Sequence, residues 1–237
     1  MIMRNLKENI EQNHYFAPQP TVTSEEGKRD LSPLYPFVIS GGENTERWYF
    51  KHISDTTEYK FNIYPEYFGK EANYTDEFPK RIEKILKSNN DAIIYCVFDW
   101  DDVRGNEKKE GKHKQFVEQH KSLINSGIVI LCPSMPSIEY WFLLHFKNET
   151  KLIKSCKNVC GLLAKDMKHC FENPSIIFTK LLKQEKYLKD PSWVANLCAD
   201  GKLEKAITRA EDNINKATAE NDLKNQSYSY VYRLFKR

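Results

Sequence analysis

Two short apolar runs that end in acidic residues constrain the fold of this chain most. The first, Phe37–Ser40, leads into Gly41-Gly42-Glu43-Asn44-Thr45-Glu46, and the second, from Cys96, ends in Asp99-Trp100-Asp101. A near-continuous apolar run is typical of a strand covered on both faces of a parallel sheet. Open α/β folds bind their ligands beyond the carboxyl ends of such strands. The two runs therefore predict an α/β fold that gathers carboxylates at one sheet edge.

The remaining pattern predicts a mostly parallel four-stranded sheet flanked by helices. Short apolar or alternating runs indicate strands, and one-sided apolar stripes between them indicate helices. Strands that alternate with helices are typical of a parallel sheet with right-handed crossovers. The expected strands are 35–40, 61–66, 92–98 and 128–132, and the expected helices between them are 45–54, 76–87 and one that follows the charged loop 101–114 and ends near 126.

Composition shifts divide the chain into three parts. Residues 1–34 are polar and interrupted by prolines, so we expect a flexible N-terminal arm. Residues 35–146 form the expected α/β domain, which ends in a very apolar helix at 138–146 with Ser137 as its N-cap. Residues 147–237 are expected to form a helical C-terminal extension packed on that domain. Its expected helices are near 151–170, 174–187, 200–219 and 227–235.

The composition excludes a membrane-spanning chain. Of the 237 residues, 40% are hydrophobic and 29% are charged, which is ordinary for a soluble globular protein. Neither an apolar run of the roughly 18 residues that a membrane helix needs nor an export signal is present. We therefore expect a cytoplasmic protein with no membrane partner.

The six cysteines also favour a reducing compartment, since no Cys-x-x-Cys pair occurs. Cys156, Cys160, His169 and Cys170 form the one cluster with the residue types of a zinc site. Their spacing matches no standard zinc motif, and the residues between them have a helical pattern. The sequence therefore does not predict a structural zinc ion.

The chain is acidic in its first part and basic in its second. Residues 1–145 hold 18 Lys and Arg against 22 Asp and Glu, and residues 146–237 hold 18 against 11. This asymmetry suits a nuclease, because basic side chains can follow a phosphate backbone while carboxylates hold a metal ion. Alternatively, Lys147, Lys151, Lys154 and Lys157 form an ordinary solvated face.

Asp99 and Asp101 are the leading candidates for binding Mg²⁺ or Mn²⁺. These ions prefer oxygen ligands, use only one or two carboxylates, and complete their shell with water and substrate phosphate. Both aspartates can serve one ion only if the chain bends after the strand. Glu43 is the expected third ligand or general base. As an alternative, strand-end aspartates cap turns, and Ser40-x-x-Glu43 fits a capping box.

Three further residues complete the candidate list. Glu46 either joins the site or interacts with the dipole of the helix that it begins. Glu139 begins the apolar helix after the fourth strand, so its carboxylate is expected at the same edge as Asp99 and needs a partner. His145 lies six residues later, about 600° around the helix, and cannot share a face with Glu139. A lone histidine in an apolar helix is more often structural than catalytic.

Three blocks of the sequence resemble the RloB-like proteins, a Toprim-related group. The family motifs run approximately Cys-Glu-Gly-Glu-x-Thr-Glu, Phe-Asp-x-Asp and Pro-x-Phe-Glu-x-Trp-Leu-Leu-x-His-Phe. Here the corresponding blocks are Ser40–Glu46, Phe98–Asp101 and Pro136–Phe146, of which the third is the most specific. Asn225–Leu234 resembles a closing family element, so the similarity covers about residues 35–235.

The resemblance implies a fold and a function. It implies a Toprim-like domain and a metal-dependent nuclease that cleaves DNA or RNA, tRNA included, in bacterial phage defence and abortive infection. Asp99 and Asp101 would bind the metal, and an ATPase of the AAA or ABC type would be the partner. A homo-oligomer is compatible with this reading.

Position 41 departs from the family pattern. Toprim domains are expected to place an essential Glu here, and this chain has Gly41. The alternative function is therefore a catalytically weakened module that binds nucleic acid or a partner. A third option is a nucleotide-binding sensor whose Gly41-Gly42 turn holds phosphate, although the pair lacks a complete phosphate-binding motif.

Overall fold

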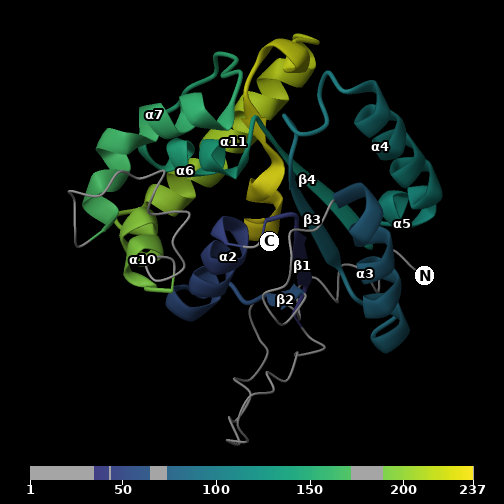
Figure 1. Ribbon diagram of the computed structural model, residues 1–237. Coiled ribbons are helices and arrows are strands. Elements are labelled where there is room, and N and C mark those ends of the chain that lie inside the picture. Colours follow the sequence, from purple (N-terminus) through teal and green to yellow (C-terminus); the bar gives the residue numbers. More distant parts are fainter. Residues whose placement is uncertain (1–34, 43, 65–73, 172–188, 237) are drawn as a thin grey trace, which may run out of the picture.

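Five strands form a single sheet at the centre of the computed structural model (Figure 1), which describes residues 35–42, 44–64, 74–171 and 189–236. The strand order is β2-β1-β3-β4-β5. The first four strands are parallel, and β5 pairs with β4 in the antiparallel direction. The strands are β1 (Phe37–Ser40), β2 (Asn62–Tyr64), β3 (Ile94–Asp99), β4 (Val129–Met135) and β5 (Tyr228–Ser229).

The chain order places a switch point between β1 and β3. From β1 the chain moves outward to β2 on one side, then returns across β1 to form β3 and β4 on the other. In the register, Ser40 lies opposite Val97, and Asp99 lies opposite Ser134. The carboxyl ends of β1, β3 and β4 therefore lie side by side, where open α/β sheets form their binding crevice.

Helices cover both faces of the sheet (Figure 1). One apolar cluster joins Val38, Tyr95 and Val97 to the helices of the first face, and a second joins alternate strand residues such as Ile39 and Cys96 to those of the other. Successive strand residues point to opposite faces, so a sheet covered twice needs apolar residues at every position. The helices of the first face are α2 (Thr45–Thr56), α6 (Ile138–Phe146), α7 (Cys156–Asp166), α10 (Ser192–Cys198) and α11 (Lys202–Ala219). The helices of the second face are α3 (Tyr74–Ser88), α4 (Glu107–Gln119) and α5 (Lys121–Asn125).

Helix α6 is the central helix of the larger cluster. Its residues from Ile138 to His145 are all buried, because the helix is apolar around its whole circumference and is enclosed by the sheet, α7 and α11. The indole Nε1 of Trp141 donates a hydrogen bond of 2.7 Å to Tyr49 Oη in α2. This packing fixes the start of α6 against the carboxyl ends of the strands.

The C-terminal segment differs from its prediction. The expected helix at 227–235 is wrong: the chain forms β5 and then a 3-10 helix, η3 (Tyr230–Phe235), so the sheet has five strands rather than four. Ser229 Oγ and Ser134 Oγ lie 2.8 Å apart in the buried interface between β5 and β4. This contact between distant parts of the chain favours strand pairing over the local helical pattern.

The other expected strands and the helices at 45–54, 76–87, 138–146 and 200–219 are confirmed within a few residues. The helix expected to end near 126 is divided into α4 and α5, and α10 was not predicted. In the expected helix 151–170, α7 is followed by the 3-10 helix η1 (Met167–Cys170). The N-terminal arm 1–34 and the expected helix 174–187 lie outside the described residues.

The division of the chain after residue 146 stays a prediction. The C-terminal extension contributes β5 to the sheet, and Arg209 in α11 donates a hydrogen bond of 2.6 Å to the carbonyl of Leu144.

In the described ranges, every helix is too short or too polar to cross a lipid bilayer.

Candidate functional site

Asp99 ends β3 at the switch point of the sheet. Its Oδ1 accepts a hydrogen bond of 2.9 Å from the backbone N–H of Ile138, the first residue of α6. The chain turns immediately afterwards, since the N–H groups of Val103 and Arg104 bond to the carbonyl of Trp100 at 3.0 and 2.9 Å. Asp99 thus serves as a cap for α6 from a neighbouring strand, and its second oxygen remains available to the site.

Asp101 lies in the turn that follows β3. Its N–H donates to the carbonyl of Pro136 at 3.1 Å. Its carboxylate accepts hydrogen bonds from the backbone N–H groups of Cys156 and Asp102. The bend required for Asp101 to serve the same edge as Asp99 is therefore present, and it brings the beginning of α7 to this edge.

Glu139 lies in the first turn of α6 and is only 9% exposed. The hydroxyl of Ser137 donates a hydrogen bond of 2.5 Å to Glu139 Oε2. Ser137 occupies the N-cap position, as predicted, but its hydroxyl makes no capping bond. Instead, Asp99 accepts the N–H of Ile138, and Ser137 orients the Glu139 carboxylate.

Glu46 lies at the same edge of the sheet, in the first turn of α2, the helix that follows β1. This glutamate is 7% exposed. Its carboxylate lies against the Cα of Gly42: a Cβ atom at position 42 would be 1.9 Å from Glu46 Oε2. Gly42 does not adopt a left-handed φ, so this position does not need glycine's conformational freedom. Glycine is needed there for space.

The electrostatics show that these carboxyl groups share one environment. Burial raises the pKa of Asp99 well above its usual range, and the neighbouring charges of Glu46, Glu139 and Asp101 raise it further. Burial also raises the pKa of Asp101, with Asp102 and Glu139 adding to the shift. Closely spaced, partly buried carboxyl groups cannot all ionise without a compensating cation. Their oxygen donors fit a hard divalent ion.

We expect Gly42→Ala to weaken divalent-metal binding about tenfold, because the new methyl group would displace the carboxylate of Glu46. Titration of Mn²⁺ into the apo-protein by calorimetry measures this effect. Gly111→Ala is the matched control, since a Cβ atom there meets no atom within 4 Å. Equal affinities for both variants would show that the position of Glu46 does not matter for the metal.

Arg81 brings a cation to this edge. This half-buried side chain of α3 donates a hydrogen bond of 3.3 Å from Nη1 to the carbonyl of Ser40, at the end of β1. Burial lowers its pKa, although an arginine remains charged at neutral pH. Arg81 was not predicted from the sequence, where its only signal is its helical spacing from Phe78 and Ile85 on the apolar face of α3.

Of the predicted site residues that the structure describes, His145 is not brought to the cluster. Glu43 lies outside the described residues. His145 is in the last turn of α6 and 2% exposed, and its Nδ1 lies 3.0 Å from the carbonyl of Trp141. Burial lowers the pKa of His145 to about 3, so it remains neutral. Its position is that of a core histidine, the alternative that the helical spacing favoured.

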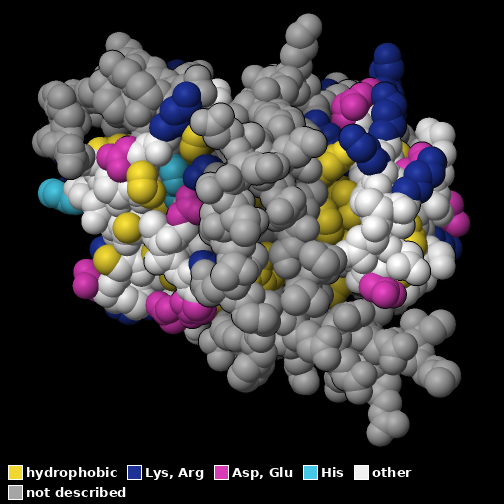
Figure 2. Space-filling view, turned by 90° about the horizontal axis from the view of Figure 1, so that it is seen from below, with side chains coloured by type: hydrophobic (Ala, Val, Ile, Leu, Met, Phe, Trp, Pro, Cys, Tyr) yellow, Lys and Arg dark blue, Asp and Glu magenta, His cyan; other side chains and the backbone are white. Residues whose placement is uncertain are grey.

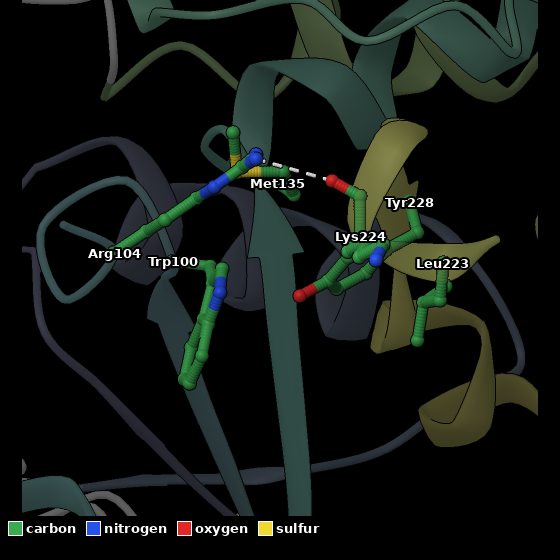
Figure 3. Close-up of a pocket in the computed structure, with 6 residues that line it drawn as sticks. All are labelled: Trp100, Arg104, Met135, Leu223, Lys224 and Tyr228. Atoms are coloured by element: carbon green, nitrogen blue, oxygen red, sulfur yellow. Dashed lines mark hydrogen bonds between the residues drawn. The ribbon is translucent and has the colours of Figure 1, made fainter. Parts of the chain in front are cut away.

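A pocket of about 340 Å³ opens beside the acidic edge (Figure 3). Trp100, the residue between Asp99 and Asp101, and Tyr228 of β5 supply aromatic walls. Arg104 crosses the pocket and donates a hydrogen bond of 3.1 Å to the carbonyl of Lys224. Met135 and Leu223 complete the lining. The pocket therefore combines aromatic surface with cationic side chains.

Basic side chains are not confined to the C-terminal part of the chain. Figure 2 shows Lys and Arg on both sides of the grey area, with the larger group on the side where Figure 1 places α3, α4 and α5. Of the four lysines named from the sequence, Lys147 pairs with Asp166 at 3.6 Å. Lys151, Lys154 and Lys157 are exposed, and the latter two flank the start of α7.

The comparison with protein families covers nearly the whole described chain. The family model of the RloB-like proteins matches residues 37–237. The chain belongs to the RloB-like family. No curated protein and no solved structure matches the chain.

The RloB-like blocks coincide with the acidic edge. Ser40–Glu46 follows from β1 into α2, Phe98–Asp101 ends β3, and Pro136–Phe146 runs from the end of β4 through α6. The block at 225–234 contains β5, which forms one wall of the pocket. At Gly41, where the RloB-like pattern has Glu, the backbone N–H bonds to the carbonyl of Val97 at 3.2 Å.

Proposed function

We propose that this protein is a metal-dependent Toprim-type nuclease that hydrolyses phosphodiester bonds in single-stranded nucleic acid. The observation that carries the proposal is the meeting of Glu46, Asp99, Asp101 and Glu139 at the switch point of the sheet. These residues come from three chain segments, and only the tertiary fold brings their charges together.

Asp99 and Glu46 are the proposed ligands of Mg²⁺ or Mn²⁺. Their carboxylates approach from β3 and α2, and Asp101 stands next to them to hold a coordinated water. A bound divalent ion would stabilise the negative charge that develops on the scissile phosphate. Glu139 adds to the negative field that attracts the ion, and Ser137 keeps its carboxylate oriented.

Arg81 is the proposed partner of the scissile phosphate. Its guanidinium is held at the end of β1 by the carbonyl of Ser40. Guanidinium groups match phosphate geometry with paired donors, so an arginine positions the phosphate more strictly than a lysine.

The pocket beside Trp100 supports single-stranded nucleic acid as the substrate class. Aromatic side chains stack with unpaired bases irrespective of sequence, and cationic side chains bind the flanking phosphates. Trp100 belongs both to the pocket and to the chain segment that carries Asp99 and Asp101. A base in the pocket would therefore lie next to the metal-binding edge.

We expect Arg104→Glu to raise the KM for a single-stranded substrate about tenfold and to change kcat less than about twofold, since Arg104 lies in the pocket but outside the carboxylate cluster. Steady-state cleavage of labelled oligonucleotides measures both constants. Lys108→Glu, an equal charge change at an exposed position of α4, is the control. An equal effect of the two substitutions would indicate only a long-range charge effect.

Family membership supports a role in bacterial phage defence and abortive infection. On this proposal the protein acts in the cytoplasm as the effector beside an ATPase of the AAA or ABC type. Pull-down of the tagged protein from cell lysate with and without ATP, followed by identification of any ATPase that it retains, tests this part separately from the nuclease assay.

The rival function is a catalytically weakened module that binds nucleic acid or a partner, and Gly41 favours it. The decisive experiment incubates the purified protein with labelled DNA and total RNA in Mg²⁺, Mn²⁺ or EDTA. The nuclease proposal expects cleavage that the chelator abolishes and that is absent from Asp99→Asn prepared identically. Binding without cleavage in any metal would favour the rival.

A further inference from the structure

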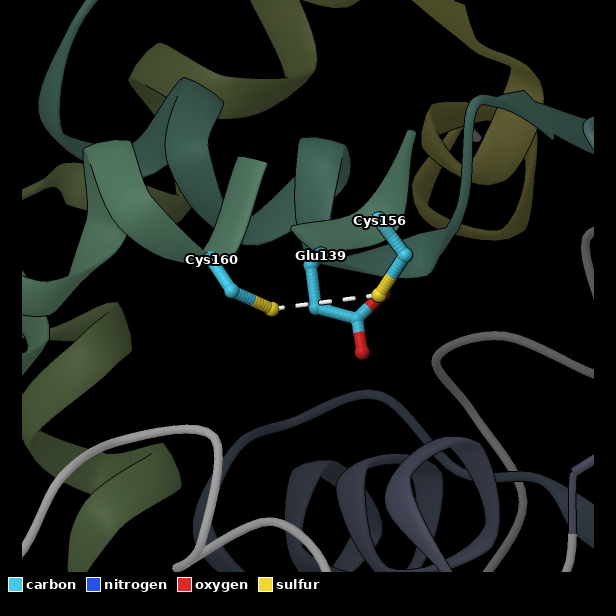
Figure 4. Close-up of side chains that lie close together, drawn as sticks. All are labelled: Glu139, Cys156 and Cys160. Atoms are coloured by element: carbon cyan, nitrogen blue, oxygen red, sulfur yellow. Dashed lines mark hydrogen bonds between the residues drawn. The ribbon is translucent and has the colours of Figure 1, made fainter. Parts of the chain in front are cut away.

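We propose that Glu139, Cys156 and Cys160 form a second metal site, selective for Zn²⁺, at the border of the carboxylate cluster. Their ligand atoms all lie within 4.8 Å of one another. Figure 4 shows the two thiols of α7 and the carboxylate of α6 converging on one point. The proposal does not depend on the nuclease proposal: it concerns a different ion, and Glu139, the residue that the two share, is not one of the proposed ligands of Mg²⁺ or Mn²⁺.

The separation of the two sulfur atoms matches that of a zinc pair. Cys156 Sγ and Cys160 Sγ lie 3.8 Å apart. Two sulfurs each bound at about 2.3 Å to a tetrahedral ion are separated by about 3.8 Å. The two thiols therefore already have the spacing that zinc requires, whereas a disulfide would require the sulfurs to approach to about 2.05 Å.

The surroundings hold the three ligands in place. Ser137 donates to Glu139 Oε2, which leaves Oε1 for the metal. The N–H of Cys156 bonds to the carboxylate of Asp101, and this bond keeps the first turn of α7 at the site. Hydrogen bonds to the groups around a metal orient its ligands and strengthen binding.

The ligand set selects the ion. Two thiolates favour a soft or borderline metal, while Mg²⁺ and Mn²⁺ favour an all-oxygen site such as that of Asp99 and Glu46. Three protein ligands leave one tetrahedral position for water or substrate, the arrangement found in catalytic rather than structural zinc sites. Cys160 is buried and Cys156 is partly exposed, so the site has an open side.

The residues that the structure brings together differ from the cysteine cluster considered from the sequence. His169 and Cys170 are not members of the group. Glu139 takes their place, although it precedes Cys156 by a loop and belongs to another helix. Spacing along the chain could not reveal this combination, because α6 and α7 meet only through packing.

Titration of Co²⁺ into metal-free, reduced protein tests the proposal, since Co²⁺ occupies zinc sites and its thiolate bonds absorb in the near ultraviolet. The wild type is expected to show this charge-transfer band and to lose it on adding Zn²⁺. Cys156→Ser and Cys160→Ser should each retain about half the intensity and bind Zn²⁺ at least about tenfold more weakly.

Two controls separate this site from others. Cys198→Ser changes a partly exposed cysteine in α10 and should leave the band unchanged. Asp99→Asn should also retain it, even though it removes the proposed hard-metal ligand. A wild type without a thiolate band, or a band that keeps its full intensity in both Cys156→Ser and Cys160→Ser, would overturn the zinc proposal. Either result would leave the nuclease proposal standing, because Asp99 and Glu46 are not involved.

Discussion

Asp99→Asn is expected to lower metal-dependent cleavage by about 10²- to 10⁴-fold, the usual range for loss of an essential charged group at an active site. The amide has the size of the carboxyl group and still offers Oδ1 to the N–H of Ile138, so the cap of α6 is preserved. The loss of activity would then reflect the missing charge. Cleavage assays in Mg²⁺ and Mn²⁺ measure it.

The same substitution should stabilise the protein in EDTA. Burial and the nearby carboxylates hold the pKa of Asp99 above its usual range. A carboxyl group whose pKa is higher in the folded than in the unfolded state stabilises the fold when protonated, and this contribution is lost as the pH rises through the folded pKa. We expect Asp99→Asn to melt above the wild type in EDTA, by a margin that grows as the pH rises above the ordinary aspartate range.

Asp55→Asn is the matched control for both effects. Asp55 is exposed in α2 and pairs with Lys51 at 2.6 Å, so its loss should change neither cleavage nor the pH dependence of melting. If Asp99→Asn melts far below the wild type without metal, Asp99 is a structural cap rather than a ligand. Full cleavage by Asp99→Asn would remove it from the site.

The second large effect is expected for Glu46→Gln. Glu46 is 7% exposed, and its carboxylate raises the pKa of Asp99 more than any other neighbouring charge does, so its loss should lower cleavage about as much as Asp99→Asn. From the sequence, Glu43 was the expected residue for this role. Glu43→Gln, tested in the same Mn²⁺ assay, should then cost less than about tenfold.

Gly41→Glu completes this comparison. If Glu46 supplies the carboxylate that the RloB-like pattern has at position 41, adding a glutamate should bring no gain. An inert wild type that gains cleavage through Gly41→Glu would instead identify a weakened binding module. A larger loss from Glu43→Gln than from Glu46→Gln would return the third ligand to Glu43.

The sequence alone determined the parallel sheet and the edge that carries the acids. The runs that end at Ser40 and Asp99 are apolar at every position, because strands covered on both faces have no polar side to reveal. Gly41 also appears in the sequence as a departure from the family pattern. These signals are local, so they can be read along the chain.

Only the tertiary structure decided which side chains meet at that edge. Arg81 reaches Ser40 from α3, Glu139 joins the thiols of α7, and β5 pairs with β4 through Ser229 although its segment has a helical pattern. Each of these contacts joins residues from separate elements. The free energy of these contacts comes from packing, burial and charge between elements that are distant in the sequence. The hydrophobic periodicity and residue spacing within one segment carry no information about such contacts.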